Sequence, residues 1–281
     1  MRVLLATSAD LPQGEPGAGV LDAALRARGL DASWARWDDP AVDWADADLV
    51  AVRSTWDYVT RHAEFLDWAA SLDQARLLNG ADVFAWNHDK RYLLDLDGLR
   101  SVPTAWVTSA TQLVAAVDGL GTAVVKPAVG AGGEGLVVLQ AGIEEDQAAP
   151  HVELGAVVVQ PLVESIHTHG EVSVFVIDGR LTQRFDKHPG EGDVRVNEEH
   201  GGRVEAVSMG GVGDLALQAY DSMTERFGRP MDYLRVDLLQ WDGDWVVSEL
   251  ELIEPGLYLD VSPANAAPFA DLVAARAAVE R

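Results

Sequence analysis

The chain has 281 residues and a formal net charge of −24, from 21 basic and 45 acidic residues. A charge this negative argues against nucleic acid and anionic membranes as partners, because both repel it. The absence of cysteine excludes disulfides, thiolate nucleophiles and cysteine metal sites. No apolar run approaches the roughly 20 residues that span a bilayer, and Met1–Thr7 is too short for a signal peptide. We therefore expect a cytoplasmic protein, long enough for two or three small domains.

The first part of the chain, residues 1–86, is predicted to be a small parallel α/β unit. Apolar periodicity predicts alternating strands and helices, which are Val3–Ala6, Gly19–Arg28, Leu49–Val52 and Ala63–Leu72. Gly29 ends the first of these helices, and Thr60 is a candidate N-cap of the second.

The remaining chain is predicted to be a lid-like middle part, residues 87–160, and a mostly antiparallel last part, residues 161–281. The middle part contains predicted strands and one helix, which are Ala105–Val107, Thr111–Val117 (the helix), Ala123–Lys126 and Leu136–Leu139. The last part begins with a hairpin through Asp178-Gly179. A helix at Asp214–Phe227, a second hairpin and a helix at Pro268–Val279 follow.

A glycine-rich turn directly follows an apolar strand that ends in Lys126. The glycines are Gly130, Gly132, Gly133 and Gly135. They leave backbone N–H groups free to close over an anion, and the lysine adds a positive charge. Neither a Walker sequence nor a dinucleotide fingerprint is present. The pattern predicts a nucleotide phosphate site, and the alternative is a glycine-rich hairpin loop with a surface lysine.

Three carboxylates are predicted to share one face of the second hairpin. Glu249 and Glu251 are two residues apart on one strand, and Asp237 can meet them from the neighbouring strand. Carboxylates crowded in this way repel one another unless a cation lies between them, and Mg²⁺ bound with phosphates fits best. The alternative is a solvated acidic face in an acidic protein.

Taken in order, these motifs resemble the ATP-grasp superfamily, and specifically its glutathione-synthetase-like branch, from about Asn87 to about Ala267. The resemblance implies an α/β (α+β overall) fold with an N-terminal Rossmann-like domain (1–86), a lid subdomain (87–160) and a C-terminal antiparallel-sheet subdomain (161–281). It also implies ATP as a cofactor. The matching ATP-binding positions are Lys90, Lys126, Gly130, Gly132, Gly133, Gly135, Gln160, Pro161, Leu162, Val163 and Glu171.

The same resemblance implies two Mg²⁺ ions, for which Mn²⁺ can substitute, and a group that faces the transferred phosphate. The implied metal ligands are Asp237, Glu249 and Glu251, and the implied catalytic residues are Lys187, Arg195 and Asn197. Two positions depart from the family pattern. Glu251 stands where relatives often have Asn, and Ser173 stands where glutathione synthetases often have Arg, which argues against the same substrate.

A substrate loop is predicted directly after the buried strand Leu49–Val52, because ligands bind beyond the carboxyl ends of parallel strands. Its residues are Arg53, Ser54, Thr55, Trp56, Asp57 and Tyr58. Arg53 offers a bidentate fork for a carboxylate. The alternative is a helix-capping loop in which Arg53 pairs with Asp57. The run is similar to one in ATP-grasp cyclo-ligases of secondary metabolism that close O-ureidoserine to cycloserine.

The resemblance implies a ligase that activates a small, amino-acid-derived carboxylate as an acylphosphate for attack by an amine-type nucleophile. Positioning and charge neutralisation would provide most of the catalysis. The expected partners are ATP and small molecules, and a homodimer and a ring-closing reaction both stay open. The alternatives are a small-molecule kinase and a non-catalytic nucleotide-binding regulator.

Overall fold

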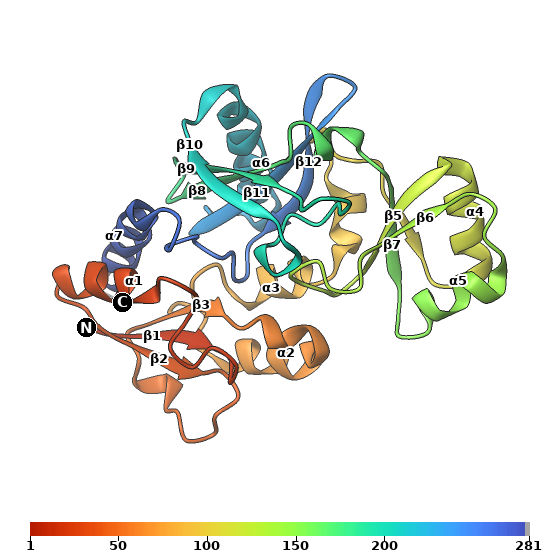
Figure 1. Cartoon of the computed structure of the whole chain (residues 1–281). Helices are drawn as coiled ribbons and strands as arrows, with labels where there is room; N and C mark the ends of the chain where they lie inside the picture. Colours follow the sequence, from red (N-terminus) through yellow and green to blue (C-terminus); the bar gives the residue numbers. More distant parts are fainter. Residues whose placement is uncertain (279–281) are drawn as a thin grey trace.

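Three β-sheets follow one another along the computed structural model, which describes residues 1–278 (Figure 1). The first sheet has the strand order β2-β1-β3, the second β4-β7-β5-β6 and the third β10-β9-β8-β11-β12. The first is parallel and the other two are antiparallel. The predicted α/β class, with a parallel unit before antiparallel sheets, is confirmed.

The first sheet is buried on both faces. It consists of β1 (Arg2–Thr7), β2 (Asp31–Arg36) and β3 (Leu49–Ser54), with helices α1 (Ala18–Ala27), α2 (His62–Ser71), α3 (Ala81–Asn87) and α7 (Ala266–Ala277) around it. Leu5 packs with Phe269 of α7, whereas Leu4 packs with Phe65 of α2. Alternate residues of one strand thus serve two cores, which explains its unbroken apolar run.

Three details of this layer differ from the predictions. The edge strand β2 was not predicted, because its exposed and half-buried residues give no apolar run. Helix α2 begins after Arg61 with no side-chain cap, so the prediction of Thr60 as N-cap was wrong. Helix α7, expected in the last part of the chain, packs beside α1 (Figure 1), and its predicted end at Val279 lies outside the described residues.

The second sheet forms a separate lobe with its own apolar core (Figure 1). Its elements are β4 (Ala105–Val107), α4 (Ala110–Leu120), β5 (Thr122–Pro127), β6 (Val137–Gln140), α5 (Glu145–Val152) and β7 (Val157–Pro161). The side chain of Ser109 caps α4 by accepting from the N–H of Gln112. Because the apolar contacts of this core are internal to the lobe, it has the character of a subdomain.

The third sheet contains both predicted hairpins. Its elements are β8 (Glu171–Ile177), β9 (Arg180–His188), β10 (Arg203–Val207), β11 (Tyr233–Trp241) and β12 (Asp244–Glu251), with α6 (Gly213–Phe227) packed against it. Asp178 and Asp242, at the two Asp-Gly turns, have φ angles of 51° and 52°. Both glycines that follow also have positive φ, as tight hairpin turns require.

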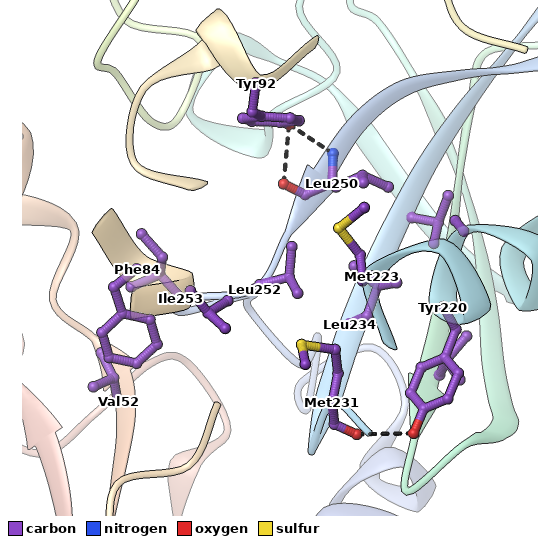
Figure 2. Close-up of a cluster of buried hydrophobic side chains, with 14 of the residues drawn as sticks. Val52, Phe84, Tyr92, Tyr220, Met223, Met231, Leu234, Leu250, Leu252 and Ile253 are labelled. Carbon is purple, nitrogen blue, oxygen red and sulfur yellow. Dashed lines mark hydrogen bonds between the residues drawn. The ribbon is translucent and has the colours of Figure 1, made fainter. Parts of the chain in front are cut away.

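A shared apolar cluster joins the first and third sheets (Figure 2). Leu250 and Leu252 of the third layer meet Phe84 of α3 and Val52 of β3 in one cluster. The hydroxyl of Tyr92 bonds to both backbone groups of Leu250, at 2.8 and 3.0 Å. This packing fixes the β11–β12 hairpin, which carries Asp237, Glu249 and Glu251 (the acidic hairpin), relative to the first sheet and its helices (the first layer). None of the helices formed by residues 1–278 has the length and apolarity that a membrane crossing needs.

Candidate active site

A cleft of about 1540 Å³ is bounded by segments of all three layers. It is lined by every residue predicted for ATP, for metal and for catalysis, and by Trp56 and Tyr58 of the predicted substrate loop. The outermost of these residues, Trp56 and Glu251, are 195 positions apart in the sequence. The tertiary structure therefore brings together the motifs that the sequence presents separately.

The glycine loop forms one wall of the cleft and touches two other predicted segments. Lys90 donates to the carbonyl of Gly130 at 2.8 Å. Gly133 has a φ of 73°, and a Cβ there would lie 2.9 Å from Oδ1 of Asn197 and 3.3 Å from Arg195. The loop thus packs against the segment predicted to face the transferred phosphate, and glycine is needed for both backbone angle and space.

The acidic hairpin has the predicted register, with Asp237 opposite Glu249 and Arg235 opposite Glu251. Each carboxylate, however, already has a basic partner. Lys90 Nζ lies 2.8 Å from Glu249. Arg235 pairs with Glu251 and, at 2.7 Å, with Asp237. The three carboxylates would otherwise repel one another, and Lys90 and Arg235 balance their negative charge within the protein.

The pKa values of these carboxyls diverge because their cationic partners differ. Burial would raise the pKa of Asp237, but Arg235 and Lys187 hold it below its ordinary value. Burial would also raise the pKa of Glu249, but the charges of Lys90 and Lys126 prevail and lower it. At Glu251 burial prevails over Arg235 and raises the pKa to about 7, with Asp237 and Glu249 adding to the effect.

The donor set suits a hard divalent cation, but the side chains are not arranged around a metal position. Carboxylate oxygens are the ligands that Mg²⁺ prefers. Among residues 1–278, no group of three His, Asp or Glu side chains converges as a metal cage would. Cation binding by Asp237, Glu249 and Glu251 therefore requires Lys90 or Arg235 to move toward another anion, such as a phosphate.

Lys187 lies buried between two predicted site residues. It pairs with Glu171, its neighbour across β8 and β9, and its Nζ lies 3.6 Å from Asp237. Ser173 donates to the same oxygen of Asp237 at 2.5 Å. Ser173 therefore bonds to a carboxylate that Lys187 and Arg235 also approach.

The ATP-binding positions 160–163, which the family resemblance implies to be the adenine hinge, lie at the end of β7 and directly after it. Gln160, Pro161, Leu162 and Val163 all line the cleft. The amide of Gln160 donates to Thr104 at 2.9 Å, and the N–H of Leu162 bonds to Thr122. Two neighbouring segments therefore hold this backbone in place beside the cleft.

The predicted substrate loop is only partly at the cleft. Strand β3 continues to Ser54, and Arg53, Ser54 and Thr55 are fully buried. Arg53 donates to Glu15 at 3.0 Å and to the carbonyl of Pro255 at 2.6 Å. The prediction that Arg53 offers an open fork to a substrate carboxylate is contradicted by this burial. Nη2 makes both of these hydrogen bonds, whereas Nε and Nη1 are buried without a hydrogen-bond partner among residues 1–278.

The alternative pairing within this loop is also absent. Asp57 accepts a hydrogen bond from the indole of Trp37 at 3.0 Å and does not pair with Arg53. Trp56 and Tyr58 do line the cleft. The loop therefore contributes aromatic walls to the cleft, whereas its arginine links the first layer to residues 254–258.

Comparisons with known proteins agree with this geometry. Residues 3–79 match the family model of the N-terminal domain of D-cycloserine synthetase DcsG, and residues 90–215 match that of the prokaryotic glutathione synthetase ATP-grasp domain. The chain is 30% identical to the cycloserine biosynthesis protein DcsG of Streptomyces lavendulae, over 90% of this chain and 91% of that protein. The chain belongs to the ATP-grasp superfamily.

Solved structures extend this ATP-grasp relationship to the whole chain. The crystal structure of D-cycloserine synthetase DcsG matches with a TM-score of 0.86 and 29% identity, over 99% of this chain and 100% of that one. D-alanine–D-alanine ligase from Bacillus anthracis shares the fold, with a TM-score of 0.68 at 15% identity over 99% and 97% of the two chains. The predicted class, an ATP-grasp carboxylate–amine ligase, is confirmed.

Among the residues of this ATP-grasp cleft that were not assigned a role from the sequence are Glu15, Arg235, Glu254 and Tyr258. Arg235 was detectable, because it precedes Asp237 by two residues on one strand and so shares its face. Tyr258 has a φ of 52°, unusual for an aromatic residue, and its ring lies 5.6 Å from the Arg235 guanidinium. Glu15 and Glu254 lie outside strands, where periodicity gives no signal.

Proposed function

We propose that this ATP-grasp ligase phosphorylates a small, amino-acid-derived carboxylate and joins it to an amine, in a biosynthetic reaction of secondary metabolism. The observation that carries the proposal is the convergence of Lys90, Lys126 and the glycine loop with the acidic hairpin in one cleft. Cations and free backbone N–H groups suit phosphates, and the carboxylates suit the metal that accompanies them.

The nucleotide would occupy the side of the cleft between the second and third sheets. The hinge at Gln160–Val163 would border the adenine, and Glu171 at the start of β8 would bind the ribose. The glycine loop would cover the phosphates, with Lys90 and Lys126 neutralising their charge. Supporting this arrangement, Lys90 already contacts both the loop and Glu249, at 2.8 Å each.

The metal would bind at the acidic hairpin, through Asp237, Glu249 and Glu251. When bound, Mg²⁺ neutralises phosphate oxygens and orients the γ-phosphoryl group. Phosphate is a competing anion for the basic side chains that now hold these carboxylates. Lys90 would then exchange Glu249 for a phosphate, and nucleotide and metal would bind together more tightly than either alone.

The reaction proceeds in two steps, phosphorylation of the carboxylate and attack by the amine. A carboxylate oxygen of the substrate takes the γ-phosphoryl group, the bond from that phosphorus to the bridging oxygen breaks, and ADP leaves. The amine nitrogen then attacks the acyl carbon, a C–N bond forms, the C–O bond to phosphate breaks, and the nitrogen loses a proton. Lys187 and Arg195 line the cleft and would offset the charge on the transferred group. The glycine loop would exclude water, which otherwise hydrolyses the acylphosphate.

The names of two structural relatives support an amino-acid-derived substrate. One relative is a D-cycloserine synthetase, and another is a D-alanine–D-alanine ligase. Both names refer to products built from small amino-acid units. We therefore place the substrate of this chain in the same chemical class and leave open whether its reaction closes a ring.

Nucleotide binding and turnover are tested separately. MgATP at millimolar concentration should raise the melting temperature of wild type, and Lys126→Ala should remove most of that shift. Turnover is then screened with ATP, Mg²⁺ and a panel of amino acids and amines, scored for ADP and inorganic phosphate. Phosphate release with a new amide supports the ligase. A stable phosphorylated product would identify a kinase, and binding without turnover a regulator. The absence of any MgATP shift would refute the nucleotide site itself.

A further inference from the structure

Glu254 differs from five other carboxyls that line the cleft, of which Glu15 and Asp237 are buried and Glu171, Glu249 and Glu251 are partly buried. Each of these five forms an ion pair with a basic side chain of the protein. Within residues 1–278, Glu254 forms none, although only 7% of its surface is exposed. Burying an ionised carboxylate without a cation costs free energy. The carboxyl of Glu254 therefore lacks the positive charge that would stabilise its ionised form.

The surroundings of Glu254 form a defined subsite. The hydroxyl of Tyr58 lies close enough to the Glu254 carboxyl to lower its pKa. Two residues further along, a Cβ at Gly256 would be 3.6 Å from the Trp56 ring and 3.6 Å from the Glu15 carboxylate. Glu254, Trp56, Tyr58 and Gly256 all line the cleft. Glu254 therefore lines the same cleft as the rings of Trp56 and Tyr58 and as the three carboxylates of the acidic hairpin.

The backbone that carries Glu254 is held firmly from behind. Arg53 donates to the carbonyl of Pro255 at 2.6 Å, and the N–H of Leu257 donates to Glu15 at 2.7 Å. Arg53 and Glu15 also pair with each other at 3.0 Å. This Arg53–Glu15 clamp therefore fixes the residues on both sides of Gly256. A fixed carboxyl loses little conformational entropy when it binds a ligand, which is the requirement for a recognition residue.

We infer that Glu254, oriented by Tyr58, is the subsite for the protonated amino group of the substrate. An ammonium group supplies the positive charge that no basic side chain among residues 1–278 supplies. Its N–H groups donate to the carboxyl, and its charge is attracted to the faces of aromatic rings. The inference rests on the proposed ligase function and narrows its substrate class to compounds with a free amino group.

The charges around Glu254 support a cation as its ligand. Burial is the largest cause that raises the pKa of Glu254 to about 8, and Glu251 raises it further. The hydrogen bond from Tyr58 and the charges of Lys90 and Arg53 oppose these effects without cancelling them. Glu254 has no ion-pair partner among the basic side chains of the described part of the chain, whereas a bound ammonium group would favour its ionised form.

The test is a binding measurement that does not need turnover. Wild type loaded with MgADP is titrated with the common amino acids in both enantiomeric forms and with their N-acetyl derivatives, by thermal shift and calorimetry. We expect at least one free amino acid to bind and its N-acetyl counterpart to bind at least tenfold more weakly. Glu254→Gln keeps the volume and the acceptor for Tyr58 but should lose at least tenfold in affinity. Glu198→Gln, which removes one exposed carboxylate from the same cleft, should bind as wild type does.

The outcomes separate this inference from the proposed function. Equal binding of free and N-acetylated compounds, or unchanged binding by Glu254→Gln, would overturn the ammonium subsite. So would the failure of every amino acid to bind to protein that still binds MgADP. Failure of wild type to bind MgATP or MgADP would instead refute the proposed function. Unfolding of Glu254→Gln is checked by its melting temperature, and Tyr58→Phe provides a second variant, expected to weaken amino-acid binding severalfold.

Discussion

Removal of the Arg53 guanidinium should destabilise the protein, because this side chain is part of a buried clamp. Arg53 is fully buried and its partner Glu15 is 4% exposed at the side chain. Arg53→Met keeps much of the apolar volume but leaves the Glu15 carboxylate without its cation and the Pro255 carbonyl without its donor. Breaking a buried pair from one side costs about 3–5 kcal/mol.

The expected cost converts to a measurable shift in melting temperature. At a typical unfolding entropy per residue, a chain of this length gains about 0.6 kcal/mol/K on unfolding. A loss of about 3–5 kcal/mol therefore lowers the melting temperature by about 5–8 °C. Differential scanning calorimetry on wild type and Arg53→Met gives this difference directly.

Two matched variants test the physical reason. Arg203 pairs with Glu205 at 3.5 Å with 72% of its side chain exposed, so Arg203→Met should shift the melting temperature by about 1 °C or less. Glu15→Gln combined with Arg53→Met removes the unpaired charge and should recover much of the loss. An Arg53→Met protein that melts as wild type does, and shows weaker substrate binding instead, would refute the clamp and restore Arg53 as a substrate ligand.

Three further outcomes follow from the cleft. Glu249→Gln should fold normally and lose at least 100-fold in turnover, because it removes one metal-binding charge at constant volume; near-normal activity would mean that the hairpin is only a solvated face. Gly133→Ala should weaken MgATP binding more than Gly132→Ala does, since a Cβ at 133 meets Asn197 at 2.9 Å whereas one at 132 meets nothing within 4 Å; equal titration curves would contradict this. The pKa of Glu254 is raised from 4.5 to about 8, so between these pH values the folded protein keeps a proton on this carboxyl that the unfolded chain has released. Stability should therefore fall as pH rises from about 4.5 to about 8 and level off above that pH, and Glu254→Gln should flatten that fall in thermal melts; parallel pH profiles would exclude the effect.

The sequence alone determined the features whose causes are local. Asp-Gly pairs fixed the two hairpin turns, because residues with positive φ match the twist of the flanking strands. The two-residue spacing of Glu249 and Glu251 placed both on one face, and the turn set Asp237 opposite Glu249. Glycines after the strand that ends in Lys126 predicted an open loop. Each of these depends on neighbours within one hairpin or one loop.

The tertiary structure decided which charges meet. Arg53 is 202 residues from Pro255 and 38 from Glu15, so no local pattern could show that its guanidinium is buried between them. Lys90 reaches Glu249 from another layer in the same way. Among residues 1–278, Glu254 lacks a basic partner because of where the folded layers place the lysine and arginine side chains. Electrostatic pairing depends on distance in space, and chain spacing does not specify that distance between layers.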